Sequence, residues 1–292
     1  MYRIITIALV AALLSACATP KRLSSLTLAD DARSEELLIE IPQQEITVDK
    51  PDVNAGGGLV GALIEGIAES TMDKNRQEAL GPVRNALADY AFDAKFQSAV
   101  TSALPAAYFV GEPETTLIRN TDDWLEAHVE RNGRSFGSVS VAYAFAPNFQ
   151  MLYVRAYVRF GDIGLVRDKN GKPKEKYTSD AERTGKLQAM SYYAMFPLDD
   201  PGKFEDNASR WTADGGRLAR EALDAGIAEV ADLVQRDFGS PLAVDESNKQ
   251  NFMLPTGSAV LSMKGGHVET RNGRRLLAVG SLMAWTSVDE GR

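Results

Sequence analysis

Cysteine is nearly absent from this sequence. The chain has one cysteine among its 292 residues, at position 17, close to the N-terminus. If residues 1–16 are removed, Cys17 becomes the first residue and the rest of the chain holds no thiol. Internal disulfides, thiolate metal clusters and a cysteine nucleophile in the folded body are then excluded. Stability must therefore come from the burial of side chains.

Histidine is scarce as well. The two histidines, His128 and His267, lie far apart in the sequence. No His-Glu-x-x-His and no Gly-x-Ser-x-Gly motif is present. Acidic pairs such as Asp122-Asp123 fit the start of a helix, although a chain this acidic always offers carboxylate pairs to a two-carboxylate glycosidase. We therefore expect no metal site and no enzyme activity.

Positive charge is in deficit. Lys and Arg number 32 against 40 Asp and Glu, a formal net charge of -8, which argues against broad nucleic-acid binding. Two basic clusters, at 169–176 and 271–275, are local exceptions on predicted hairpin tips. They are either solvated turns that protect strand edges or a docking surface for anionic lipid headgroups or an acidic partner. The docking interpretation rests on Lys172, Lys174, Arg274 and Arg275.

The N-terminus has the features of a secretion signal. Arg3 supplies the positive charge, and an apolar run of roughly a dozen residues follows at 4–14. Leu14-Ser15-Ala16-Cys17 then resembles the lipobox of bacterial lipoproteins. The resemblance implies diacylglycerol transfer to the Cys17 thiol, cleavage before Cys17, and acylation of the new amino group. The alternative is an ordinary signal peptide, cut at the small residues around Ala16.

The lipobox also implies a destination and a domain plan. Asp after the cysteine would resemble an inner-membrane retention signal, but Ala18 stands there. We therefore expect the outer membrane, with the protein facing the periplasm. Residues 1–16 form the signal peptide, 17–35 a polar, lipidated tether, and 36–292 a single periplasmic domain. Beyond the signal, the chain has no apolar run of about 18 residues that could span a membrane.

A glycine-rich segment at 54–58 opens a long predicted helical region, in which Leu59, Leu63, Ile67 and Thr71 lie on one stripe. The spacing Gly-x-Gly-x-x-Gly at 56–61 matches a dinucleotide-binding turn, but the helical pattern continues where a second parallel strand is required. We therefore expect no cofactor. Gly57, Gly61 and Gly66 leave one side of this helix almost without side chains. That side suits close packing within the fold, an oligomer or partner contact, or membrane activity, and Glu65 argues against the last.

Further helices are expected on either side of the central strands. Gly81-Pro82 is expected to break the first helical region, and Asp93 to cap a new helix that carries Phe96 and Val100. A small helix is expected from Thr121 to about 132. The strongest helical spacing extends over 207–238, where Trp211, Leu218, Leu223, Ile227, Val230 and Leu233 recur on one face.

Strands account for most of the remaining pattern. Apolar residues alternate over 139–145 and 152–160 around Pro147-Asn148, which predicts an antiparallel hairpin. Further strands are expected at 37–48, interrupted at Pro42, at 107–110 and at 187–196, with a charged turn at Asn170-Gly171. A last hairpin is expected from arms at 258–269 and 276–285 around the turn Arg271-Asn-Gly-Arg274.

This order of elements predicts an α+β fold in which helices pack on one face of a mostly antiparallel sheet. The arrangement resembles the small α+β domains of envelope transport-accessory lipoproteins at the level of fold alone. We expect a membrane-anchored envelope lipoprotein with a non-enzymatic binding or scaffolding role. Its partners would be membrane lipid, through acylated Cys17, and an envelope protein. The alternatives are an auxiliary subunit of an envelope transport or assembly complex, and a periplasmic hydrolase.

Overall fold

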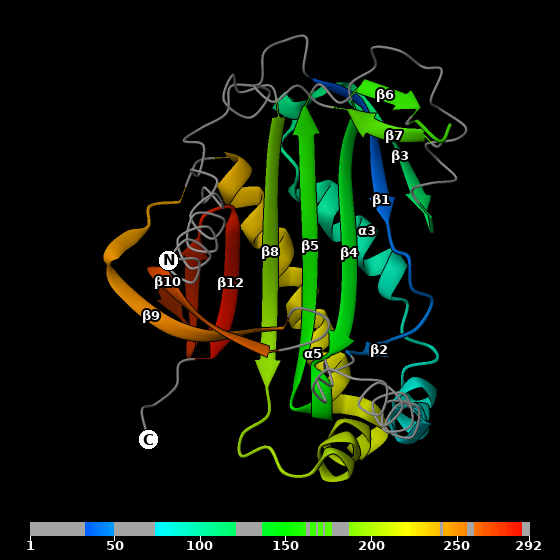
Figure 1. The fold of residues 1–292 in the computed structure, drawn as a ribbon, viewed down its shortest axis with the longest axis vertical. Helices are drawn as coiled ribbons and strands as arrows, with labels where there is room; N and C mark the ends of the chain where they lie inside the picture. The colour runs from blue at the N-terminus through cyan, green and yellow to red at the C-terminus, as the bar shows by residue number, and fades with distance from the viewer. Residues whose placement is uncertain are drawn as a thin grey trace, which may run out of the picture.

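The structure is a computed structural model (Figure 1). It describes residues 33–49, 74–120, 136–161, 164–167, 169–171, 173–176, 187–239, 242–255 and 260–287. The predictions for Cys17, the glycine-rich helix with Gly57, Gly61 and Gly66, the small helix from Thr121, and Lys172 lie outside these residues.

A single large sheet of ten strands dominates the fold, in the order β3-β1-β4-β5-β8-β12-β11-β10-β9, with β2 paired to β4 off this path. A separate two-stranded hairpin is formed by β6 and β7. The strands are β1 (Ser34–Glu40), β2 (Thr47–Val48), β3 (Phe109–Ile118), β4 (Phe136–Phe145), β5 (Met151–Gly161), β6 (Gly164–Arg167), β7 (Pro173–Lys176), β8 (Leu187–Pro197), β9 (Asp245–Pro255), β10 (Val260–Arg271), β11 (Arg274–Val279) and β12 (Leu282–Ser287).

Few helices accompany this sheet in the described part of the chain. They are a helix at 74–86, α3 (Phe92–Ala103) and α5 (Phe204–Gly239), together with the short 3-10 turns η2 (Ala106–Tyr108) and η3 (Pro147–Phe149). None of these helices combines the length and apolarity that a membrane crossing requires.

The sheet is mixed, so the predicted mostly antiparallel sheet is wrong. β1 pairs in parallel with both β3 and β4, β2 pairs in parallel with β4, and β12 pairs in parallel with β8. The remaining pairings in this sheet are antiparallel. Parallel neighbours need a long crossover, and helical segments supply it: helix 74–86 and α3 lie between β1 and β3, and α5 lies between β8 and β12.

The main core lies between the sheet and the helices α3 and α5, which run behind the central strands in Figure 1. Alternate residues of β4, such as Val139 and Val141, are fully buried there, as the alternation predicts. α5 approaches the sheet closely because it carries Gly226. A Cβ at that position would lie 2.6 Å from Cγ2 of Val154 on β5.

A second, smaller core covers the opposite face. The predicted fold, helices packed on one face of a mostly antiparallel sheet, is therefore wrong: the described part of the protein is mostly a large mixed sheet with few helices. In Figure 1, β9 arches across β12 and β8 on the side away from α5. Phe252 and Leu254 of β9 are buried there in one cluster with Tyr153 and Met195. β10 carries Gly265-Gly266 next to an irregularity in its pairing with β9, between Gly266 and His267. Glycine and bulges of this kind let a sheet curl over itself.

α5 follows the predicted helix at 207–238 but is broken near its first third. Ala213 is extended, and Asp214, Gly215 and Gly216 have positive φ values. Leu218, expected on the buried stripe, is exposed. It follows the break and, at 3.6 residues per turn, falls on a different side of the helix from Leu223 and Ile227. Trp211 before the break and Leu223 after it are both buried.

Two local predictions are wrong. Asp93 does not cap α3, whose first turn has no side-chain cap; instead, Asp93 forms an ion pair with Arg119. Gly81-Pro82 does not break the helix, because the helix at 74–86 continues through both residues. The hairpin of β4 and β5, the strand β8, and the turn at Asn170-Gly171 are confirmed, and β1 ends before Pro42.

Candidate functional site

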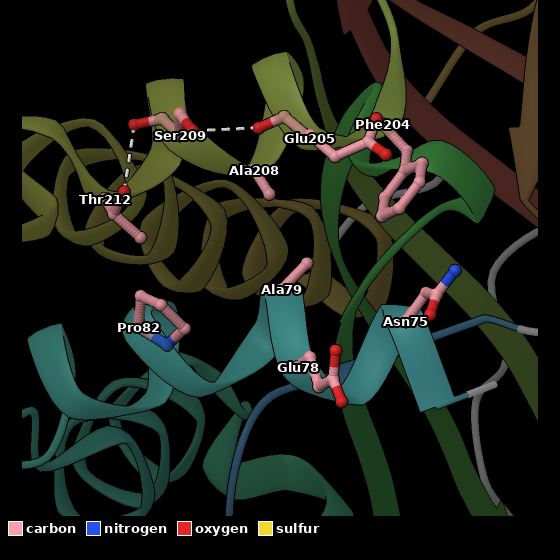
Figure 2. A pocket seen from close by; sticks show the side chains of 9 residues that line it. All are labelled: Asn75, Glu78, Ala79, Pro82, Phe204, Glu205, Ala208, Ser209 and Thr212. Atoms are coloured by element: carbon pink, nitrogen blue, oxygen red, sulfur yellow. Dashed lines mark hydrogen bonds between the residues drawn. The ribbon is translucent and has the colours of Figure 1, made fainter. Parts of the chain in front are cut away.

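A groove of about 380 Å³ lies between helix 74–86 and the first half of α5 (Figure 2). The two helices run side by side in the same direction, with Asn75 beside Phe204 at one end and Pro82 beside Thr212 at the other. The lining residues are Asn75, Glu78, Ala79, Pro82, Phe204, Glu205, Ala208, Ser209 and Thr212.

The two helices converge just beyond the groove. Gly216, in the break of α5, lies so close to Ala86 that a Cβ on Gly216 would stand 2.9 Å from the Cβ of Ala86. Arg220 fastens this end, because its guanidinium donates to the Ala86 carbonyl and to the Asp89 carboxylate. The Arg220 hydrogen bond holds the pKa of Asp89 below its usual value. The two helices are therefore held together at the α5 break.

Two buried side chains fix the first part of α5 in place through hydrogen bonds. The buried indole of Trp211 donates from Nε1 to the Phe149 carbonyl at 2.7 Å. Asn207, also buried, donates to the Asn148 carbonyl at 2.9 Å and accepts from the Gly202 amide at 2.9 Å. These bonds tie this wall of the groove to the turn between β4 and β5, so the groove is a preformed feature.

The floor of the groove is apolar and made of small side chains. Ala79 and Ala208 point toward each other across it, and Pro82 lies beside them (Figure 2). The Phe204 ring stands at one end. Small residues at such a crossing leave room that a larger pair would fill, and this is the reason a hollow exists here.

The polar lining consists largely of hydrogen-bond acceptors. Ser209 donates its hydroxyl proton to the Glu205 carbonyl and Thr212 donates to the Ser209 carbonyl, each at 2.9 Å (Figure 2). These hydroxyls therefore offer only lone pairs to the groove. Glu78 and Glu205 are its two charged residues, and both are acids. Within the described residues, the ion pair of Glu78 is a long contact of 3.9 Å with exposed Lys74.

A second cavity, of about 260 Å³, lies on the other side of helix 74–86 and includes Arg84, Tyr90 and Tyr143 in its lining. Arg84 and Tyr90 are bonded to the surrounding protein. Arg84 Nε lies 3.0 Å from a carboxylate oxygen of Glu45 and donates to the Ile46 carbonyl. Burial raises the pKa of Tyr143 to about 12. The groove is larger, and it is the better candidate for binding.

An acid-sensitive contact holds α3 to α5 near this second cavity. Asp224 accepts hydrogen bonds from Lys95 at 2.6 Å and from Tyr90 at 2.7 Å. Burial alone would raise the pKa of Asp224, but the bonds from Lys95 and Tyr90 outweigh it and lower that pKa. A depressed carboxyl pKa contributes stability above the unfolded value, which is lost as pH falls through the folded value.

We therefore expect Asp224→Asn to flatten the acid side of the stability profile. The melting temperature of the variant should fall less than that of the parent as the pH is lowered from about 5 toward 2. Thermal melts across this range measure the difference, with Asp206→Asn on the exposed side of α5 as control. A parallel decline in parent and Asp224→Asn would contradict the contact.

The basic residues predicted to dock on anions are in different surroundings. Arg274, expected on an exposed tip, is mostly buried: it donates to Glu229 at 2.8 Å and to the Met195 carbonyl at 2.9 Å. The expectation of an exposed tip is wrong for this residue. Arg275 donates to the Asn251 carbonyl at 2.9 Å. Lys174 lies in β7, on a different hairpin, so the structure does not bring the two clusters together. Anion docking stays a prediction.

Metal-ligating residues do not gather within the described ranges. No group of three or more His, Cys, Asp or Glu residues there could hold an ion. His267 lies in β10, with Nε2 3.0 Å from the Thr270 hydroxyl. His128 and Asp122-Asp123 lie outside the described residues.

Sequence reasoning missed the groove, although a signal for it exists. Glu78, Ala79 and Pro82 recur with the spacing of one helix face, as do Glu205, Ala208 and Thr212. Each set pairs an acid with a small residue instead of a large apolar one. Neither set indicates by itself that the two faces meet.

Comparisons with known proteins add little. The sequence matches no protein-family model, and no curated protein matches it significantly. One solved structure, a PelC dodecamer from Paraburkholderia phytofirmans, is similar over 71% of this chain and 94% of that chain, with 11% identity and a TM-score of 0.23. A TM-score this low carries no argument about fold or function.

Proposed function

We propose that this protein is an outer-membrane lipoprotein with a non-enzymatic binding or scaffolding role, facing the periplasm. The observation that carries the proposal is Leu14-Ser15-Ala16-Cys17, which places the one cysteine of the chain where a lipobox requires it. Several acyl chains on Cys17 would anchor the protein stably, because each buried methylene contributes about 0.8 kcal/mol.

The groove supports a binding role for the anchored domain. It lies between two helices and is lined by apolar and acceptor groups, and one of its walls is fixed in place by the buried bonds of Trp211 and Asn207. A preformed groove loses little conformational entropy when it is filled. The lipid would hold the domain at the membrane surface, and the groove would take up an envelope component.

The test of the proposal is Cys17→Ala. We expect the variant to lose palmitate labelling completely and to leave the membrane fraction or accumulate as unprocessed precursor, because the acylated thiol is gone. Metabolic labelling with palmitate, followed by fractionation and mass analysis of the N-terminal peptide, measures this. Wild-type protein that is soluble in the periplasm, with no acyl mass on that peptide, would contradict the proposal.

Ala18→Ser is the matched control for Cys17→Ala. It keeps the cysteine and a small residue after it, so labelling and fractionation should match the parent.

Co-purification from detergent-solubilised envelopes tests the transport-subunit alternative, which requires a stoichiometric complex. The hydrolase alternative requires turnover of cell-wall or ester substrates that a single carboxylate or serine substitution abolishes.

A further inference from the structure

The groove has a one-sided hydrogen-bonding character. The described polar residues that line it are Glu78, Glu205, Ser209, Thr212 and Asn75. The hydroxyl protons of Ser209 and Thr212 are already donated to the Glu205 and Ser209 carbonyls. Only the Asn75 amide offers protons. A ligand that carries hydrogen-bond donors and positive charge satisfies such a lining, whereas an anion meets repulsion from both carboxylates.

The shape of the groove selects among cationic ligands. Its floor of Ala79, Ala208 and Pro82 is apolar, and the acids stand at its rim. A lysine side chain matches this layout, because its methylene stem packs on apolar surface while its ammonium group stays in the polar rim. The small floor residues also let the backbone of a helix from another protein approach the groove closely.

We propose that the groove binds a lysine-bearing helical segment of a partner protein, with a lysine stem on Ala79 and Ala208 and its ammonium between Glu78 and Glu205. This inference rests on the proposed binding function and names the chemistry of the partner. A free alkylamine would gain too little here, since an exposed ion pair contributes about 0 to 1 kcal/mol. The partner's backbone and apolar contacts supply the remainder.

The binding experiment uses the mature, acylated protein in neutral detergent micelles. The probe is a fluorescein-labelled, alanine-rich helical peptide with lysine at every fourth position, and fluorescence anisotropy reports binding. A peptide with glutamate in place of lysine is the first comparison, and unlabelled spermidine is the competitor. We expect the lysine peptide to bind, the glutamate peptide not to bind, and added salt to weaken the complex.

Variants of the groove locate the complex. The double variant Glu78→Gln with Glu205→Gln should weaken binding of the lysine peptide by about five- to twentyfold, because two ion pairs of up to about 1 kcal/mol are removed. Ala79→Leu should abolish binding by filling the floor, while circular dichroism reports an intact fold. Glu112→Gln with Glu114→Gln, on exposed positions of β3, removes the same charge elsewhere and should leave binding unchanged.

Three results would overturn the inference. They are no binding of the lysine peptide, equal binding by the parent and the Glu78–Glu205 double variant, and displacement of the peptide by an equal concentration of spermidine, which indicates a site for small amines. If Cys17 is acylated while the peptide fails to bind, the groove inference fails and the lipoprotein proposal stands. If the peptide binds while Cys17 carries no acyl group, the lipoprotein proposal fails and the groove inference stands.

Discussion

Arg274→Ala is expected to lower the free energy of unfolding by about 3–5 kcal/mol, because it removes one partner of a buried ion pair. The side chains of Arg274 and Glu229 are only 17% and 16% exposed. Arg274 also donates to the Met195 carbonyl, and its guanidinium lies 4.3 Å from the centre of the Phe196 ring. Without Arg274, the Glu229 carboxylate of α5 would remain buried with its main partner gone. Denaturant unfolding monitored by circular dichroism measures the loss.

The pH dependence of this loss identifies its cause. Burial raises the pKa of Glu229, and Arg274 opposes that rise. In Arg274→Ala the pKa of Glu229 should rise further. The loss of stability should therefore be larger at neutral pH than in acid, where Glu229 is protonated in both the folded and the unfolded protein. The double variant Glu229→Leu with Arg274→Met removes both charges and should recover most of the loss. A deficit independent of pH would assign the effect to lost packing.

Trp211→Ala is expected to destabilise the protein by about 3–5 kcal/mol, because it empties a large buried site. Trp211 is 1% exposed, and its ring centre lies 5.3 Å from that of Phe145 on β4. The side chain joins the first half of α5 to the sheet, so its removal should also loosen one wall of the groove. Binding of the lysine peptide by the folded variant should therefore weaken along with its stability.

Trp211→Phe separates packing from hydrogen bonding. This substitution keeps most of the ring but loses the bond from Nε1 to the Phe149 carbonyl, and leaving a buried polar group unpaired costs about 1–3 kcal/mol. A small loss for Trp211→Phe together with a large loss for Trp211→Ala would agree with this account. Nearly equal losses would mean that the hydrogen bond dominates.

Elements with strong local patterns could be predicted from the sequence. The alternation of Val139 with Val141 and of Val154 with Val158 predicted β4 and β5, because strands with one buried face carry a period of two. β9 was missed because its first residues, from Asp245, are polar and exposed, and an edge strand of this kind shows no alternation. Local pattern therefore reveals buried faces and misses edges.

Relations between distant segments could not be predicted. The sheet was expected to be mostly antiparallel because hairpins are visible in the sequence, whereas the parallel pairing of β8 with β12 depends on which strands meet after a long crossover. The buried ion pair of Glu229 and Arg274 could not be predicted for the same reason: neither residue's own segment shows which distant residue it will meet. The groove exists only because helix 74–86 and α5 lie side by side.

The place of β12 in the sheet has a consequence for the order of synthesis. β12, the last strand in the described part of the chain, lies between β8 and β11 in the sheet. A chain that emerges from its N-terminus exposes β8 with one edge unpaired until residues near Leu282 arrive. An unpaired strand edge invites pairing with other chains. Loss of β12 by proteolysis or early termination would therefore yield a product that tends to aggregate rather than a shortened, working protein.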